Sequence, residues 1–177
     1  ELHEDDEGDR LQVPIHISRP SLRPVRATAA AAGYDLCAAE SVVLGADHQW
    51  VSVATGLKIA MSADQIRSRL FPNTIFGTVR GRSGLTKKGV DVFHGTIDAD
   101  YLGEIKVLMR NTTGDPISIA RDDRIAQLVF GLAFQPTLTE CADFDNEFKT
   151  ARGTGGFGST GTSLVVSEPS CAPVESV

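Results

Sequence analysis

The sequence predicts an all-β subunit, a distorted β-barrel or jelly roll with one or two short helices. Short stretches of alternating apolar and polar residues recur along the chain, separated at intervals of roughly 8–12 residues by turn-forming Gly, Asp, Asn and Pro. These stretches are rich in valine, isoleucine and threonine, which favour a pleated, half-buried surface. With 177 residues and 41% hydrophobic content, the chain is long enough for one domain with its own core.

Five alternating stretches are the expected strands. They are residues 11–18, 48–61, 73–81, 104–111 and 124–131. Clusters of Gly, Asp, Asn and Pro between them predict turns, because these residues supply turn conformations. Successive side chains of a strand point to opposite faces, so each stretch is expected to bury one face and expose the other.

Two short segments predict helical turns. Residues 62–70 begin with Ser62, have Gln65 three residues later and continue with apolar residues four apart, which is the pattern of a capped helix. A second helical turn is expected after Ser83, where glycines on either side keep it short.

Most of the negative charge lies at the two ends of the chain. The net charge is −6, of which residues 1–10 carry −5 and residues 162–177 carry −2, so residues 11–161 carry only +1. We expect residues 1–10 to be an acidic disordered segment and residues 162–177 to be a disordered tail. Between them the sequence predicts a β-barrel domain over residues 11–150 and a glycine-rich arm over residues 151–161.

Composition and cysteine usage exclude several classes of protein. A general nucleic-acid binder needs a basic face, whereas this chain is acidic. No apolar run approaches the roughly 20 residues of a membrane span. Cys37, Cys141 and Cys171 are far apart and odd in number, which argues against a disulfide framework and against a zinc site. We therefore expect an intracellular protein, in the cytoplasm or the nucleus, with no membrane and no nucleic-acid partner.

The segment RGTGGFGSTG, residues 152–161, contains the pattern G-x-G-x-x-G. In a dinucleotide-binding domain this pattern follows a strand and opens a helix inside a βαβ unit of about 30 residues. Only 19 residues follow Gly158, and they include two prolines. The position of the segment therefore argues against a dinucleotide site.

Two shorter motifs place polar groups among small residues. In AAGYDLCA, residues 31–38, Asp35 is the only charged residue, and a turn or capping role would also explain it. The motif GRSGL puts Arg82 and Ser83 beside Gly84. Glycine lets the backbone approach an anion, arginine supplies a planar pair of donors and serine supplies a hydroxyl. Taken alone, either motif also fits an ordinary turn.

The segment HGTIDADYLGEIKV, residues 94–107, carries two carboxylates two residues apart. In an extended strand Asp98 and Asp100 would point to the same face, whereas a turn would splay them. A carboxylate beside a water can act as a general base, and Tyr101 could wall off a sugar or a base. A hairpin turn with solvated acids is the simpler alternative. Gln127, in RDDRIAQLVF, lies among apolar neighbours and is either structural or ligand-facing.

Five motifs, AAGYDLCA, GRSGL, GTIDADYLGE, DRIAQLVF and RGTGGFGSTG, occur in this order between residues 31 and 161. In these motifs the chain resembles the trimeric-type dUTPase family, the deoxyuridine triphosphate nucleotidohydrolases. The resemblance implies a distorted β-barrel or jelly-roll subunit and a homotrimer with three active sites at subunit interfaces. It also implies Mg²⁺-dependent hydrolysis of dUTP to dUMP and pyrophosphate, which removes dUTP and supplies dUMP for dTTP synthesis.

The resemblance implies a role for each matching residue of the first and third motifs. Asp98 would activate the water that attacks the α-phosphorus. Tyr101 would pack on the deoxyribose and leave no room for a 2′-hydroxyl. Backbone groups around Gly95 and Ile97 would read the uracil edge, and Asp35 would bind magnesium through its coordinated waters.

The second, fourth and fifth motifs imply contacts to the phosphates and the uracil. Arg152 would grip the terminal phosphate, and Phe157 would cover the uracil. The arm is expected to be flexible when empty and to order over a bound nucleotide. The other residues expected to hold or close on the phosphates are Arg82, Ser83, Gly84, Gln127, Gly158 and Ser159.

Two alternatives remain open at this point. The first is an interaction protein built on the same scaffold, for which Glu175-Ser176-Val177 would be a PDZ-type C-terminal ligand. The second is an enzyme like dCTP deaminase, which shares the fold. The chain also departs from the family pattern in an insertion near residues 62–70 and in Arg121-Asp122, which precedes Asp123 where a glycine is usual. We expect the change at Asp122 to be confined to its turn.

Overall fold

The computed structural model describes residues 11–62 and 75–155. The chain divides into two units, residues 1–135 and 136–177. The predicted disordered ends, the predicted helix beyond Ser62, and Phe157, Gly158 and Ser159 lie outside the described residues.

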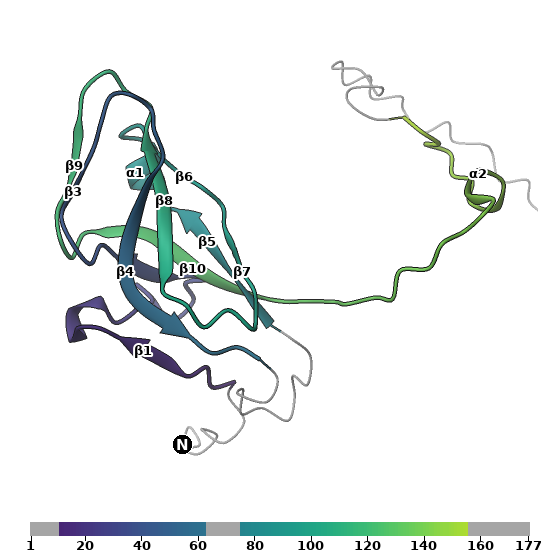
Figure 1. Cartoon of the computed structure of the whole chain (residues 1–177), viewed down its shortest axis with the longest axis horizontal. Helices are drawn as coiled ribbons and strands as arrows, with labels where there is room; N and C mark the ends of the chain where they lie inside the picture. The colour runs from purple at the N-terminus through teal and green to yellow at the C-terminus, as the bar shows by residue number, and fades with distance from the viewer. Residues whose placement is uncertain (1–10, 63–74, 156–177) are drawn as a thin grey trace, which may run out of the picture. The chain divides into compact units, whose positions relative to one another are not determined.

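The described part of the first unit is built of ten strands, a 3₁₀ turn (η2) and one helical turn (Figure 1). The strands are β1 (Ile15–Ile17), β2 (Tyr34–Cys37), β3 (Val42–Leu44), β4 (Val51–Ile59), β5 (Ile75–Gly81), β6 (Val90–Val92), β7 (Thr96–Ile97), β8 (Ile105–Asn111), β9 (Ile117–Ile119) and β10 (Arg124–Leu132). The helical segments are η2 (Pro20–Leu22) and α1 (Ser83–Thr86).

The strands form three antiparallel sheets, with orders β1-β4-β8-β6, β2-β10-β5-β7 and β3-β9. Neighbouring strands in these sheets are often distant in sequence, as for β2 beside β10. The same holds for β4 beside β8 (Figure 1). The all-β fold class predicted from the sequence is confirmed, as is the helical turn after Ser83.

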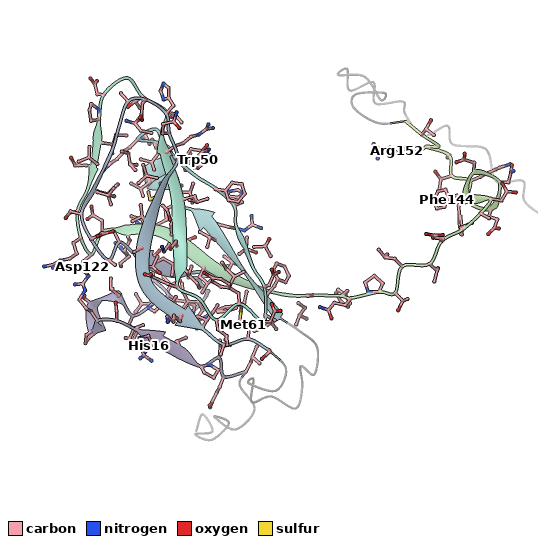
Figure 2. All side chains as sticks on the ribbon, viewed as in Figure 1. His16, Trp50, Met61, Asp122, Phe144 and Arg152 are labelled. Atoms are coloured by element: carbon pink, nitrogen blue, oxygen red, sulfur yellow. The ribbon has the colours of Figure 1, made fainter. Side chains whose placement is uncertain are left out.

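The core lies between the inward faces of these sheets. On β8 the side chains of Ile105, Val107 and Met109 are fully buried, whereas Lys106 and Leu108 between them are exposed. Each fully buried apolar side chain contributes about 1.5–3 kcal/mol relative to leaving it in water. The cluster continues on β2, β3, β4, β5, β6, β9 and β10 and includes Met61 just after β4 (Figure 2). Alternation along the strands therefore fixes which side chains face outward to the site.

The long alternating stretches gave the long strands. The predicted stretches 48–61, 73–81 and 104–111 contain β4, β5 and β8, and the stretch 124–131 contains all of β10 but its last residue. The prediction for residues 11–18 was too long, because the strand β1 covers only Ile15–Ile17, where it pairs with β4. The five strands that no stretch predicted, β2, β3, β6, β7 and β9, are two to four residues long.

In the second unit the structure describes the short helix α2 (Phe144–Glu147) and a turn around Gly153, whose φ is +53°. The rings of Phe144 and Phe148 contact one another with centroids 5.1 Å apart. The boundary between barrel and arm at residue 150 stays a prediction. Among the described residues, the helices are all too short and too polar to cross a membrane.

Candidate active site

A buried carboxylate on β2 organises a cluster of polar side chains. Asp35 is only 3% exposed. Arg82 Nε donates to its Oδ1 at 3.1 Å, Arg124 Nη1 donates to its Oδ2 at 3.1 Å, and Gln127 Nε2 donates to Oδ1 at 3.4 Å. Burying an unpaired carboxylate is very costly, so these partners are what allow Asp35 to lie inside the barrel.

Strand register brings the cluster together. Gln127 on β10 pairs directly with Asp35 on β2. Between Arg124 and Ala126 the register shifts by one residue, so that Arg124 lies opposite Cys37. Cys37 is two residues beyond Asp35 and therefore on the same face of β2. Without this bulge, the Arg124 side chain would point to the face of β10 opposite to Gln127, because the two residues are three positions apart in the strand.

Arg82 links this cluster to α1. It lies between the end of β5 and the start of α1, and its Nη1 donates to the carbonyl oxygen of Arg124 at 3.0 Å. Its own carbonyl accepts a hydrogen bond from Thr86 Oγ1 at 3.2 Å, which closes the helical turn. Ser83 and Gly84 follow directly. A Cβ atom added at Gly84 would meet nothing within 4 Å, so the backbone there is open to an incoming group.

These residues line a hollow of about 450 Å³, which we call the basic hollow. It brings together Arg82, Ser83, Gly84 and Gln127, which the motifs assigned to phosphate oxygens. Its lining contains three cationic side chains and only one aspartate, and this excess of positive charge suits an anionic ligand. The complete lining is Arg82, Ser83, Gly84, Leu85, Lys88, Ile119, Asp123, Arg124, Ile125 and Gln127.

Asp98 lies in a second hollow of about 490 Å³, which we call the acidic hollow. Asp100 lines it too, together with Ala99 and Phe76. Tyr101 N donates to Asp98 O at 3.1 Å, so the segment is a turn and not an extended strand. Both carboxylates are exposed and nevertheless face the same hollow. Among the described residues the two hollows share no lining residue, so Asp98 and the predicted phosphate ligands line separate hollows of the chain.

The orientation of Tyr101 is fixed by two neighbours. Its hydroxyl donates to the carbonyl oxygen of Glu104 at 3.0 Å. A Cβ atom added at Gly103 would overlap the Tyr101 ring, so this ring position requires glycine. The ring is 44% exposed and free to contact a ligand.

Gly95 and Ile97 lie on and beside β7, which pairs with β5. Gly95 N donates to Phe93 O at 3.0 Å, and Gly95 O accepts from Val79 N at 2.9 Å. The amide of Gly95 is thus already engaged, and it offers a ligand only the second lone pair of its carbonyl oxygen. Ile97 is half-buried.

Arg152 lies in the second unit, where its Nε donates to the carbonyl oxygen of Gly155 at 2.8 Å (Figure 2). Its guanidinium is exposed to solvent. The roles of the glycine-rich arm stay predictions.

Sequence reasoning missed Arg124 and Lys88 as members of the basic hollow. For Arg124 the available signal was its place in the motif DRIAQLVF. It lies three positions before Gln127, however, and in a regular strand this spacing predicts that the two side chains point to opposite faces. The cluster also affects Cys37. Partial burial, with smaller contributions from Asp35 and Asp122, raises the pKa of the Cys37 thiol despite the nearby arginines.

The residues present fit a magnesium ion that arrives with a nucleotide. Among the described residues, no three His, Cys, Asp or Glu side chains gather as a ready metal site. Asp35 already accepts three hydrogen bonds from cations and an amide, which leaves about one of its four lone-pair positions. That position can accept a hydrogen bond from one metal-bound water, and magnesium commonly keeps several waters.

Comparisons with known proteins agree with the motifs. The family model described as dUTPase matches residues 20–161. The deoxyuridine 5'-triphosphate nucleotidohydrolase of Paramecium bursaria Chlorella virus 1 is 40% identical over 139 residues, covering 78% of this chain and 89% of that protein. The protein of the same name from Rattus norvegicus is 36% identical over 159 residues, covering 89% of this chain and 69% of that protein.

Solved structures share the fold. The Staphylococcus bacteriophage 80alpha dUTPase with dUPNHPP matches with a TM-score of 0.72 at 24% identity, covering 85% of this chain and 98% of that chain. A mutant dUTPase from phage phi11 of S. aureus, described with a structural Mg(II) ion, matches with a TM-score of 0.64 at 22% identity, covering 76% of this chain and 99% of that chain.

Proposed function

The chain belongs to the dUTPase family, and we propose that it hydrolyses dUTP to dUMP and pyrophosphate as a magnesium-dependent homotrimer. The observation that carries the proposal is the basic hollow, which Arg82, Ser83, Gly84 and Gln127 line together, and in which the buried Asp35 holds Arg82 and Gln127.

The basic hollow supplies what a triphosphate requires. In-line displacement at phosphorus depends on charge neutralisation and positioning more than on covalent chemistry. Arg82 is held by Asp35 and by the carbonyl of Arg124, so its remaining donors are oriented before a ligand arrives. Ser83 and the open backbone at Gly84 add a hydroxyl and an unobstructed approach. Magnesium, held by phosphate oxygens and contacted through water by Asp35, would supply further charge neutralisation.

Asp98 is the proposed general base. It is exposed in the acidic hollow, where a water can lie between its carboxylate and the α-phosphorus. Tyr101, held by Glu104 and Gly103, would present its ring to the deoxyribose and exclude a 2′-hydroxyl. Backbone groups near Ile97 would read the uracil, and Gly95 would contribute at most its carbonyl oxygen.

A trimer would unite the two hollows. Asp98 and Arg82 line separate hollows of one chain, yet both are needed around one triphosphate. This separation supports an active site between subunits, in which one chain supplies the basic hollow and its neighbour supplies Asp98. Cyclic symmetry would then give each of the three sites the same composition. Arg152 and the arm with Phe157, Gly158 and Ser159 would close over the bound nucleotide.

The direct test is a substrate comparison with the purified protein and Mg²⁺. We expect conversion of dUTP to a monophosphate and pyrophosphate, and no turnover of UTP or dCTP. Release of ammonia from dCTP would support the deaminase alternative instead. Absence of any turnover would contradict the enzymatic proposal and favour an interaction role.

Replacing the proposed base separates catalysis from binding. Asp98→Asn should lower kcat by about 10²–10⁴, the usual contribution of a positioned general base, while a non-hydrolysable dUTP analogue still binds. Asp100→Asn is the matched control, because Asp100 lines the same acidic hollow two residues away. Equal losses in the two variants would show that Asp98 has no special role.

A further inference from the structure

Arg124, the first residue of β10, has no role in the motif assignments above, yet it completes the cluster around Asp35. We propose that Arg124 is a further phosphate-binding residue, with one edge of its guanidinium anchored on Asp35 and the rest presented to the triphosphate. This inference rests on the proposed hydrolysis of dUTP, since it places one more residue in that same site.

The β10 bulge is the first argument. An extra residue between Arg124 and Ala126 turns the Arg124 side chain to the face that carries Asp35 and Gln127. Bulges interrupt strand pairing, and they are found preferentially beside active sites, where they redirect a side chain. A charged residue at the end of a strand can reach solvent without such a bulge, so solvent exposure alone does not explain it.

The free donors of Arg124 are the second argument. A guanidinium has five N–H groups. Among the described residues, Arg124 uses one of its donors, Nη1, on Asp35. Arg82 uses two, Nε on Asp35 and Nη1 on the Arg124 carbonyl. The Arg124 side chain is 53% exposed against 28% for Arg82, and both line the basic hollow. Arg124 therefore has more donors available to a ligand than Arg82.

Charge balance is the third argument. One buried carboxylate, Asp35, is shared by two guanidinium groups, so the cluster keeps one net positive charge. A purely structural ion pair would need only one arginine. The unbalanced charge faces the hollow that Lys88 also lines. Anchoring one edge on a carboxylate fixes the plane of the guanidinium, which then binds phosphate oxygens with two parallel donors.

Lysine at position 124 tests the geometry while conserving the charge. An ammonium carries its three donors on one nitrogen, so it cannot keep one edge on Asp35 and offer a phosphate two parallel donors as a planar guanidinium does. Arg124→Lys should weaken binding of an α,β-imido analogue of dUTP by about tenfold or more, the effect of losing a charge-assisted hydrogen bond. Binding of deoxyuridine, which has no phosphate, should change less than about twofold, within the spread of surface substitutions.

Arg121→Lys is the matched control. Arg121 is three residues away on the preceding turn, is 64% exposed and does not line the basic hollow. We expect wild-type affinity for both ligands. The proposal is overturned if Arg124→Lys binds the analogue as tightly as Arg121→Lys does. It is equally overturned if the affinities for the analogue and for deoxyuridine fall together, because a structural role would affect both.

A second measurement uses the wild-type chain and so does not depend on the folding of a variant. Phenylglyoxal modifies exposed arginines, and peptide mass spectrometry distinguishes Arg124 from Arg121. The dUTP analogue should protect Arg124 and leave Arg121 reactive, whereas deoxyuridine should protect neither. Equal modification of Arg124 with and without the analogue would refute the contact. If the wild type neither binds the analogue nor hydrolyses dUTP, the proposed function fails first and this inference fails with it.

Discussion

Asp35 shows how one residue can position several others. It lies on β2, but its oxygens hold side chains from the end of β5 and from β10. Its burial makes those contacts obligatory, because removing one partner leaves a charge or a dipole without compensation. The proposed phosphate ligands Arg82 and Gln127 are therefore oriented by a residue that itself scarcely reaches solvent.

Asp35→Asn should lower the free energy of unfolding by about 1–3 kcal/mol, less than for a fully buried pair because both arginines are partly exposed. Urea denaturation measures this difference. The control is Asp91→Asn, which breaks the exposed pair between Asp91 and Arg110 at 2.9 Å. Its effect should stay below about 1 kcal/mol, as is usual for surface ion pairs. Equal effects of the two substitutions would contradict the organising role of Asp35.

Asp122 contacts residues outside its own turn. Its φ of +70° lies in the left-handed region, which glycine adopts with the least steric strain. Its carboxylate accepts from Ser21 Oγ at 3.0 Å and pairs with Arg19 Nη2 at 3.1 Å, which ties η2 to the turn before β10 (Figure 2). The sequence-based expectation that this change is confined to the turn was therefore wrong, because the side chain reaches residues about a hundred positions away.

The pH dependence of stability should reflect Asp122. Desolvation acts to raise the pKa of Asp122, but hydrogen bonds from Ser21 and Arg19 and the charges of Arg19 and Arg121 hold it below its ordinary value of 3.8. A lowered folded-state pKa stabilises the fold above the unfolded pKa, and this stabilisation is lost as the pH falls through the folded pKa.

Asp122→Asn should accordingly lower the Tm at pH 7 and lower it progressively less toward pH 2, because the stabilisation that it removes exists only while the wild-type carboxyl is ionised. Asparagine tolerates the left-handed conformation, so the backbone is conserved. Calorimetry at the two pH values gives the comparison. A loss of Tm that is the same at both would show that the charge of Asp122 does not stabilise the fold.

At the scale of elements, length decided what the sequence could predict. β4 and β10 have nine residues each, enough for several alternations that mark a buried face. β7 has only two residues, Thr96 and Ile97, and exists because β5 lies beside it. β3 and β9 likewise pair with each other across more than seventy residues of chain. Such pairing is set by tertiary packing, which no local pattern reports.

The residues of the candidate site also divide into those that the sequence predicted and those that it did not. The motifs placed Arg82, Ser83, Gly84 and Gln127 in one site, and the structure brings these four to one hollow. Arg124 escaped prediction because a bulge changes which face it occupies, and bulges leave no clear mark in a single sequence.

The bulge in β4 gives a prediction for an element. The register with β8 shifts between Ala54 and Leu57, where Gly56 has a φ of +66°. Gly56 N donates to Glu104 Oε1 at 2.7 Å, and a Cβ atom added there would collide with Ser18 and Leu22. Gly56 thus permits both the bulge and the approach of η2.

Gly56→Ala should destabilise the fold by more than about 1 kcal/mol, because alanine disfavours positive φ and the added Cβ has no space. Gly114→Ala is the control, since a Cβ atom at Gly114 would meet nothing within 4 Å. Its effect should remain within about 0.5 kcal/mol, as for surface substitutions generally. Chemical denaturation of both variants measures the two effects. Similar denaturation midpoints for Gly56→Ala and Gly114→Ala would contradict the packing argument at Gly56.

At the scale of the whole molecule, the basic and acidic hollows are two incomplete sites. The basic hollow gathers the proposed phosphate ligands, and Asp98 is not among the residues that line it. Among the described residues, the lining of the acidic hollow contains Asp98 and Asp100 but no cationic side chain. Assembly of subunits is the simplest way to join them, and it makes catalysis dependent on the trimer.

Subunit complementation tests this account most directly. Asp98→Asn chains and Arg82→Ala chains are each expected to be nearly inactive. When they are unfolded together and refolded as mixed trimers, random assembly should give about one intact site in four, provided that each site takes Asp98 from one chain and Arg82 from another. We predict that dUTP turnover reappears at roughly that fraction of the wild-type rate. Mixed trimers that form, as native mass spectrometry would show, but remain as inactive as the parents would contradict the account.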